Sequence, residues 1–317
     1  MLYDNSLLTV TYLEAFQATG KPFYREVVEE TLGYILREMY DQQNGGFYST
    51  QDADSEGEEG KFFVWTPDEV EQILGQADAK VFCDFYDVTD HGNFEHQNIL
   101  WVKTPTDLYT KKTNIEQTDL INILSRCKKK LFDAREKRIK PGLDDKILTS
   151  WNGLMIRSMG LAYQILGDPR YLEAAETSAK FILKELVQKN GHLLRTHRAG
   201  KSHLNACLED YSYFIAGLIE LYQASFDPHW LREANRLNQI MISQFWDSQN
   251  GGFFFTGKDH PELIVRSKSA YDGATPSGAS MAVHVLLRLA ILLNQPDLKE
   301  KAKITFSLYD HTMKTAP

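Results

Sequence analysis

The chain has 317 residues, of which 43% are hydrophobic and 12% aromatic, and its formal net charge is −8. This acidic balance argues against nucleic acid and anionic membrane as partners, and no segment has the apolar length of a membrane span or the pattern of a signal peptide. Three scattered cysteines, Cys83, Cys127 and Cys207, lack the spacing of a zinc site and indicate reduced thiols. We therefore expect a cytoplasmic protein without a metal or cofactor.

Helical segments that end in Asn-Gly recur along the chain. Segments 41–48 and 247–254 both contain Asn-Gly-Gly-Phe, and 189–193 is a blunter copy. A proline precedes the glycine of each copy by 22 or 23 positions, and one more proline marks a fourth unit. These four prolines are Pro22, Pro169, Pro228 and Pro296. A fixed internal period of this kind predicts a repeated supersecondary unit.

The unit consists of two helices with different patterns. In chain order, helices are predicted over 5–19, 23–40, one or two segments between 67 and 88, 117–137, 150–166, 170–187, 208–225, 229–246, 277–293 and 297–313. Helices before each proline are apolar nearly all round, whereas those after it are amphipathic. Buried inner helices that alternate with amphipathic outer ones predict an all-α fold, an (α/α)6 toroid, as a single domain over 1–317.

Ten helices form five inner and outer pairs, one fewer than a six-hairpin ring needs. We therefore expect the chain to be an incomplete fragment that is poorly soluble or oligomeric alone. Short strands are predicted over 47–50, 61–66 and 98–102, and a β-hairpin is predicted from 253–256 and 263–265. Such hairpins would join each outer helix to the next inner one, at the face where the inner helices begin.

Polar and aromatic residues occupy the predicted starts of the inner helices. They form the clusters Tyr3-Asp4-Asn5, Ser150-Trp151-Asn152-Gly153, Glu209-Asp210-Tyr211 and Pro276-Ser277-Gly278. Because the clusters lie at the same offset before the proline markers, we expect them to converge on one face. Carboxylates, amides and aromatic rings around a cavity suit a sugar. The alternative is that Asp, Asn and Ser at these positions only cap helices.

Two loops add further candidates. The acidic loop 51–60 resembles a calcium-binding loop only loosely, and its Asp52 and Asp54 lie near a predicted strand and could face the site. Asp144, Asp145 and Lys146 directly precede an inner helix, where the lysine could hold one aspartate ionised while the pKa of the other rises. The alternative is a surface turn with a salt bridge. No phosphate-binding loop and no Ser-His-Asp spacing is present.

Six ordered motifs resemble one known family. They are Met1–Asn5, Gln51–Gly57, Phe63–Thr66, Asp144–Leu154, Leu208–Tyr211 and Asp272–Gly278. Together they resemble the thioredoxin-domain-containing proteins of the spermatogenesis-associated protein 20 family, over essentially the whole chain. The resemblance implies a thioredoxin-like domain followed by an (α/α)6 toroid similar to N-acylglucosamine 2-epimerases and six-hairpin glycosidases. Since the chain opens inside the first motif, we expect the thioredoxin-like domain and one helical hairpin to lie upstream.

Two functions are compatible with these residues. The first is a carbohydrate-active enzyme that hydrolyses, epimerises or isomerises a sugar or sugar derivative. Its candidate acids and bases are Asp4, Asp144, Asp145, Glu209 and Asp210. Its candidate substrate-binding residues are Asn5, Asp52, Asp54, Trp65, Lys146, Trp151, Asn152, Tyr211, Asp272 and Ser277. The second is a non-catalytic toroid that binds the thioredoxin-like domain of the full-length protein as a scaffold.

The residue types at the inner-helix starts favour one kind of chemistry. True epimerases of this fold use histidines as acids and bases, whereas these positions offer Asp, Glu, Asn and Trp. This departure favours chemistry carried out by carboxylates, as in six-hairpin hydrolases. Exchange of Asp145 or Asp210 for asparagine is therefore expected to abolish any sugar-dependent signal at little cost in stability.

Overall fold

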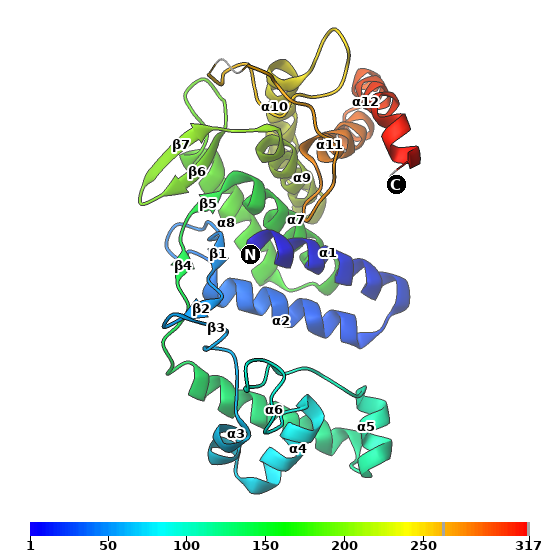
Figure 1. Cartoon of the computed structure of the whole chain (residues 1–317). Helices are drawn as coiled ribbons and strands as arrows, with labels where there is room; N and C mark the ends of the chain where they lie inside the picture. Colours follow the sequence, from blue (N-terminus) through cyan, green and yellow to red (C-terminus); the bar gives the residue numbers. More distant parts are fainter. Residues whose placement is uncertain (262–263, 316–317) are drawn as a thin grey trace. The chain divides into compact units, whose positions relative to one another are not determined.

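The structure is a computed structural model that describes residues 1–261 and 264–315. Its elements are labelled in Figure 1. The chain forms two compact units: unit 1 comprises Met1–Thr50 and the chain from Asp144 onward, and unit 2 comprises Gln51–Leu143. A single toroid domain over 1–317 was predicted from the sequence; the division into two units does not test this, and it stays a prediction.

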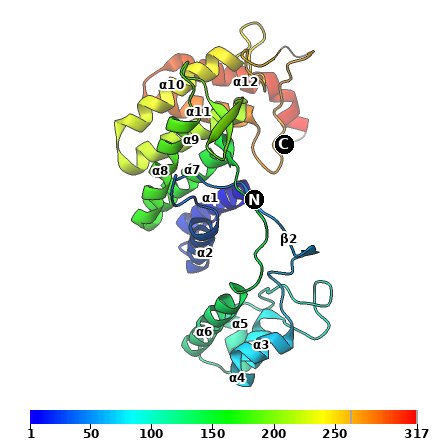
Figure 2. The same ribbon diagram turned by 90° about the vertical axis from the view of Figure 1, so that its left-hand side faces the viewer.

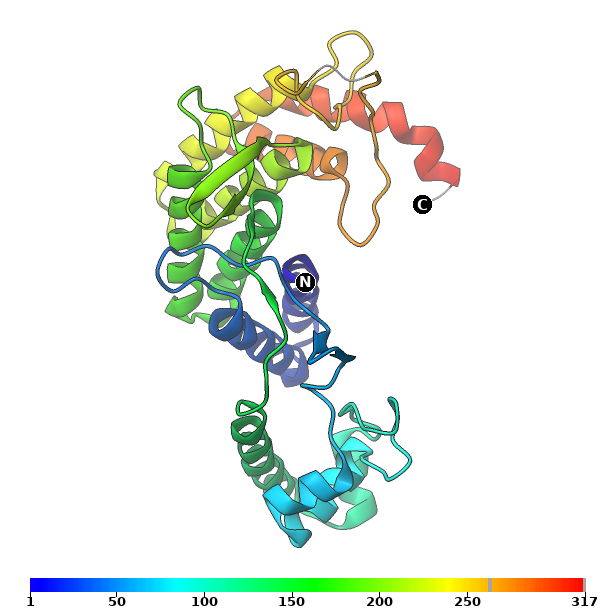
Figure 3. The same ribbon diagram turned by 60° about the vertical axis from the view of Figure 1, so that its left-hand side comes forward.

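Unit 1 is built from four helical hairpins. The pairs are α1 (Leu2–Thr19) with α2 (Pro22–Glu38), α7 (Thr149–Leu166) with α8 (Pro169–Glu185), α9 (Leu208–Ser225) with α10 (Pro228–Phe245), and α11 (Gly278–Leu292) with α12 (Pro296–Thr315). The first helices of the pairs pack on one another in the order α1, α7, α9, α11, and each second helix packs on its own partner. Figure 3 shows the hairpins following one another along a curve from blue to red. The predicted all-α class and toroid type of helix pairing are confirmed.

Burial separates the inner helices from the outer ones. Inner helix α9 buries 13 of its 18 residues, whereas outer helix α10 buries 6 of 18. The difference follows from the sequence, because a helix that is apolar on most sides can be covered on most sides, while an amphipathic helix covers one face only. The assignment of inner and outer helices from their patterns is thus correct for this pair.

The hairpin turns are set by aspartate and proline. Asp168 and Asp227 each precede the proline that opens an outer helix, and their carboxylates accept hydrogen bonds from the backbone N–H groups of Arg170 and His229. These bonds satisfy donors that have no partner within the helix. Proline fits directly after the cap, since its missing N–H is not needed there.

Loss of one cap should have a modest and measurable effect. Asp227→Ala removes the acceptor that binds the His229 N–H at 2.8 Å, so we expect the free energy of unfolding to fall by about 1 kcal/mol. Asp227→Ser keeps a side-chain oxygen at the cap and should retain most of the stability. Urea unfolding of both variants checks this; equal losses in the two would show that the cap bond is unimportant.

The repeated Asn-Gly-Gly-Phe segment forms the same turn in both complete copies. Asp41 accepts a hydrogen bond from the backbone N–H of Asn44 at 3.1 Å, and Asp247 accepts one from that of Asn250 at 3.3 Å. The glycine that follows each asparagine has a positive φ, 96° at Gly45 and 74° in the second copy, a conformation that glycine adopts without strain. The phenylalanine that closes each copy is fully buried. The internal repeat is therefore a structural repeat.

A three-stranded antiparallel sheet lies beside the starts of α7 and α9. It consists of β5 (Ile147–Leu148), β6 (Leu194–Arg198) and β7 (Lys201–Asn205), in that order. The β6–β7 hairpin joins outer helix α8 to inner helix α9, as predicted for such connections. The two-residue strands β1 (Thr50–Gln51) and β4 (Leu143–Asp144) lie where the chain leaves and re-enters unit 1.

The other predicted strands are reduced to single bridges. Segments 47–50, 61–66 and 98–102 contribute the bridges Tyr40–Phe47 and Trp65–Asn98, and only Thr50 of these residues lies in a strand, β1. Segment 253–256 likewise has one bridge, from Phe253 to Trp246. Part of the expected second arm of that hairpin, residue 263, lies outside the described residues. Aromatic content alone misled here, because these segments pack as irregular loops without a continuous pairing partner.

Unit 2 is a smaller helical group (Figure 2). It contains α3 (Pro67–Leu74), α4 (Gln76–Tyr86), α5 (Thr106–Thr113), α6 (Gln117–Arg135) and the short pair β2 (Asp54–Ser55) and β3 (Glu58–Glu59). Helix α6 packs against α3, α4 and α5. Arg138 stacks over Trp65, with its guanidinium carbon 4.1 Å from the ring centroid. Helix α5 is absent from the predicted set because Tyr109 is its one buried residue, which gives no periodic apolar pattern.

Candidate functional site

The inner helices of unit 1 begin at one common end. The rings of Tyr3 on α1 and Trp151 on α7 lie 4.9 Å apart, centroid to centroid. The backbone N–H of Ser150 on α7 donates to the Asp210 carboxylate on α9 at 3.1 Å. A Cβ atom on the first residue of α11 would lie 3.0 Å from the side chain of the first residue of α9. These contacts bring the four predicted clusters together at one face.

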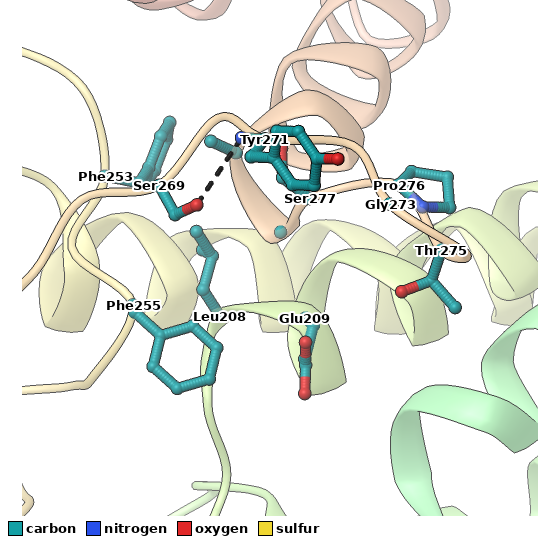
Figure 4. A pocket seen from close by; sticks show the side chains of 12 residues that line it. Leu208, Glu209, Phe253, Phe255, Ser269, Tyr271, Gly273, Thr275, Pro276 and Ser277 are labelled. Atoms are coloured by element: carbon teal, nitrogen blue, oxygen red, sulfur yellow. Dashed lines mark hydrogen bonds between the residues drawn. The ribbon is translucent and has the colours of Figure 1, made fainter.

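A cavity of about 270 Å³ opens at this end, between the starts of α9 and α11. Figure 4 shows Leu208, Glu209 and Phe255 beneath the loop that carries Tyr271 and Thr275. The Glu209 carboxylate is the one charged side chain among the described residues that line the cavity. The walls thus combine aromatic rings, hydroxyl groups and a single carboxylate.

Arg195 on β6 ties the two carboxylates at the start of α9 together. Its guanidinium lies 2.8 Å from Glu209 Oε1 and 3.4 Å from Asp210 Oδ2. The Glu209 side chain is 24% exposed, whereas that of Asp210 is completely buried. Asp210 also accepts a hydrogen bond from the Cys207 N–H at 2.8 Å, which caps α9. Glu209 can therefore reach a ligand, and Asp210 holds the framework.

Burial changes the protonation of this group. Removal from water raises the pKa of Asp210 to about 6, although the charge of Arg195 and the N–H of Cys207 oppose the rise. Burial alone would lower the pKa of Arg195, but the nearby carboxylates of Asp210 and Glu209 outweigh it and raise that pKa. The arginine therefore stays charged and fixes the position of the Glu209 carboxylate.

The Asp144, Asp145 and Lys146 group forms ion pairs. Lys146 Nζ lies 3.0 Å from Asp144 Oδ2, and Arg198 Nε lies 2.5 Å from Asp145 Oδ1. Partial burial of Asp144 acts to raise its pKa, but hydrogen bonds from Lys146 outweigh this and the net pKa is lowered. The lysine thus holds Asp144 ionised, and Asp145 pairs with Arg198. The alternative of a turn with salt bridges describes these contacts.

Three predicted ligand-binding residues belong to the core instead. The Asn152 side chain is fully buried, with Oδ1 accepting from the Phe47 N–H at 2.8 Å and Nδ2 donating to the Phe47 carbonyl at 2.9 Å. Tyr211 is 1% exposed, and its hydroxyl accepts from the Leu193 N–H. Trp65 is 2% exposed. The role in sugar binding expected for these side chains is therefore corrected, because none has a surface left for a ligand.

Other predicted residues at the helix starts act as caps or remain exposed. Ser277 caps α11 by accepting from the Ser280 N–H at 3.1 Å, and Asp272 accepts from the Ser277 N–H at 2.8 Å. Asn5 donates to the carbonyl four residues before it. The Asp4 side chain is 41% exposed. Trp151 is half-buried against Tyr3 and keeps part of its surface accessible.

Asp52 and Asp54 lie in unit 2. Asp52 accepts a hydrogen bond from the Asp54 N–H at 3.3 Å, and Asp54 pairs with Glu59 in the short β2–β3 ladder. Both side chains are exposed. Over residues 1–261 and 264–315, no group of three or more His, Cys, Asp or Glu side chains is arranged to hold a metal ion. The loose resemblance of this loop to a calcium site therefore gains no support from the geometry.

Arg195 and several residues that line the cavity were not among those predicted from the sequence. Arg195 lies in a strand whose position depends on its pairing with β5, and Tyr271 and Thr275 lie in an irregular loop. A possible signal for Arg195 was its place in the connection that leads to α9, where two adjacent carboxylates need a cation. Phe255 is a residue of the aromatic segment that was predicted to be a strand.

The fold defines the class of this chain: it is an α/α toroid type of protein, with a cavity at the N-terminal ends of the inner helices α9 and α11. Over its whole length the chain is similar to spermatogenesis-associated protein 20 of Homo sapiens, with 34% identity over 352 residues. It is also 33% identical to the protein of the same name in Rattus norvegicus, and 30% identical to an uncharacterized protein of Caenorhabditis elegans. The family resemblance predicted from the motifs is confirmed.

The chain spans less than half of these relatives, 45% of the human protein and 47% of the worm protein. No protein-family model matches it. Similar solved structures include a D-mannose isomerase, with a TM-score of 0.48, 11% identity, and coverage of 98% of this chain and 75% of that one. A GH76 α-mannanase of Bacteroides thetaiotaomicron has a TM-score of 0.46, 13% identity, and coverage of 98% and 74%. No helix in the described part of the chain has the length and apolarity needed to cross a membrane.

Proposed function

We propose that unit 1 binds a sugar or sugar derivative in the cavity between α9 and α11, with Glu209 as its principal polar ligand. The observation that carries this proposal is the Glu209 carboxylate, which lines a cavity of about 270 Å³ and is fixed by Arg195 at 2.8 Å. A carboxylate can accept hydrogen bonds from two neighbouring hydroxyl groups at once. Its orientation by an arginine prepares it for such a ligand.

The cavity walls match the two kinds of surface on a sugar. Tyr271 is 84% exposed and Phe255 is half-buried, so both can offer ring surface to the apolar face of a pyranose. Ser269 and Thr275 provide hydroxyl groups at the rim of the same cavity. Aromatic walls with a few fixed polar groups are typical of small-molecule sites.

The number of carboxylates favours one reaction type. Glycoside hydrolysis normally needs two carboxyl groups on opposite sides of the scissile bond. Among the described residues, Glu209 alone supplies a carboxylate to the cavity, and Asp210 is turned into the protein by its hydrogen bonds to Cys207 and Ser150. We therefore propose proton transfer by Glu209, of epimerase or isomerase type.

The free cysteines support a cytoplasmic location.

A thermal-shift screen of sugars and sugar phosphates tests this function. A sugar present at 100 times its Kd should raise the melting temperature by about 5–10 °C. Glu209→Gln should abolish the shift, because the amide accepts fewer hydrogen bonds and loses the charge that pairs with Arg195. Glu176→Gln is the matched control: Glu176 is 28% exposed and pairs with Lys180 on outer helix α8. A shift that survives in the Glu209 variant would contradict the proposal.

The alternative is a non-catalytic module that binds a thioredoxin-like domain in the full-length protein. It is favoured by the fate of the predicted carboxylates, since those of Asp144, Asp145, Asp210 and Asp272 are all engaged in ion pairs or caps. The test is turnover. A sugar that binds and exchanges a C–H proton for deuterium in D2O supports the enzyme, whereas absence of both binding and exchange supports the module.

A further inference from the structure

A thiol, an imidazole and a carboxylate form a chain of contacts beside the start of α9. Cys207 Sγ is 4.0 Å from His260 Nε2. The other nitrogen of the same ring, Nδ1, is 3.2 Å from Asp259 Oδ1. The cysteine is 8% exposed, and the histidine and aspartate side chains are 15% and 23% exposed. The three groups are therefore sheltered from water but not sealed.

Asp259 is held in place from two further sides. His192 Nδ1 lies 2.8 Å from Asp259 Oδ2, and Asn205 Nδ2 donates to the Asp259 carbonyl at 2.6 Å. With both carboxylate oxygens engaged, Asp259 favours the tautomer in which His260 carries its proton on Nδ1. The Nε2 lone pair then faces the sulfur. A nucleophile, a base and a group that orients the base are the parts of an activated nucleophile.

The thiol needs such a base in order to react. Burial raises the pKa of Cys207 to about 11; Asp210 and Glu209 add to the rise, while Arg195 opposes it. At neutral pH the sulfur is consequently protonated, and a standing thiolate does not account for any reactivity. The position of Cys207 at the N-terminus of α9 favours negative charge on the sulfur as it develops.

We propose that Cys207 is a nucleophilic site for small uncharged electrophiles, with His260 as the general base and Asp259 as its positioning residue. In the reaction, a bond forms between Sγ and the electrophilic carbon while the bond from that carbon to its leaving group breaks. The thiol proton passes to His260 Nε2, and the leaving group departs with the electron pair of the broken bond. The carboxylates of Asp210 and Glu209 act on the thiol against one arginine, and that of Asp259 lies behind the His260 ring, so an uncharged reagent is preferred over an anion.

Iodoacetamide provides the probe, and Cys83 provides a control within the same chain. In this reaction an S–C bond forms, the C–I bond breaks and iodide leaves. Burial also raises the pKa of Cys83 to about 11, but Cys83 is more exposed than Cys207, and Cys207 is the thiol that has a histidine nitrogen 4.0 Å away. Peptide mass spectrometry after brief labelling at pH 7.5 gives both rates. General-base assistance should make Cys207 react at least tenfold faster; equal rates, or a faster Cys83, would overturn the proposal.

Variants locate the source of the effect. His260→Gln should lower the labelling rate of Cys207 at least tenfold and leave that of Cys83 unchanged. His203→Gln, at an exposed histidine of β7 that the proposal does not use, should change the Cys207 rate by less than threefold. An unchanged rate in the His260 variant would refute its role. The wild-type comparison with Cys83 stands even if that variant unfolds.

Discussion

Replacement of Gly153 by alanine is expected to lower the free energy of unfolding of unit 1 by about 3 kcal/mol, since overpacking a filled core costs this order of energy. A Cβ atom at this position would lie 2.5 Å from the backbone nitrogen of Phe214 and 2.5 Å from the carbonyl carbon of Tyr213, both on α9. Backbone atoms cannot rotate away as a side chain can. The contact is reciprocal, because a Cβ on Gly217 would lie 2.8 Å from the Gly153 carbonyl oxygen.

A second glycine gives the matched control. Gly33 also lies within a helix, α2, and no atom lies within 4 Å of the Cβ it would acquire. Gly33→Ala should therefore raise stability by about 0.5–1 kcal/mol, the usual gain in a helix interior. Urea unfolding followed by circular dichroism measures both. A loss below about 1 kcal/mol for Gly153→Ala would mean that α7 and α9 can move apart, and the close approach of the inner helices would then be wrong.

Asp210→Asn is expected to cost about 1–3 kcal/mol of stability, as is usual when a buried polar group loses its partner. One carboxylate oxygen accepts from Ser150 and the other from Cys207 and Arg195. An amide has one oxygen only, so its NH2 group would face a donor. The burial seen in the structure therefore reverses the expectation from sequence that this exchange would cost little.

The pH dependence of the Asp210 variant follows from the raised pKa. The folded-state pKa of Asp210, about 6, lies above the ordinary aspartate value of 3.8, so protonation favours the folded state. Stability from this residue grows as the pH falls from 7 toward 4 and is constant above about 7. The stability difference between wild type and Asp210→Asn should consequently widen over that range. Asp145→Asn, at a side chain 46% exposed and paired with Arg198, should cost less than about 1 kcal/mol. Similar losses in the two variants would contradict the buried role of Asp210.

The helices of unit 1 could be predicted closely from the sequence. Segment 208–225 coincides with α9, and 150–166 begins one residue after the start of α7. The signals were strong because each proline marker, cap and Gly-rich exit acts locally, within one turn of the helix it bounds. Helix α5 and the loop strands were mispredicted, since their conformation depends on packing partners distant in the sequence.

The candidate site was predicted in its location and less well in its side chains. From their equal spacing before the proline markers, the inner-helix starts were predicted to converge on one face. Contacts between Tyr3 and Trp151 and between Ser150 and Asp210 agree with this prediction. Spacing cannot show which way a side chain points. Tyr211, two positions after Glu209, is buried on the far side of the same helical turn. Likewise, His260 lies more than fifty residues from Cys207 in the sequence, so their contact could be found only from the structure.

A crystal structure of the chain with a sugar identified by thermal shift would show whether the cavity binds it. We expect electron density for the sugar between the starts of α9 and α11, with ring hydroxyl groups within hydrogen-bond distance of the Glu209 carboxylate and one sugar face against Tyr271. Density for the sugar at another place on unit 1, or a Glu209 side chain that makes no contact with it, would show that this cavity is not the binding site.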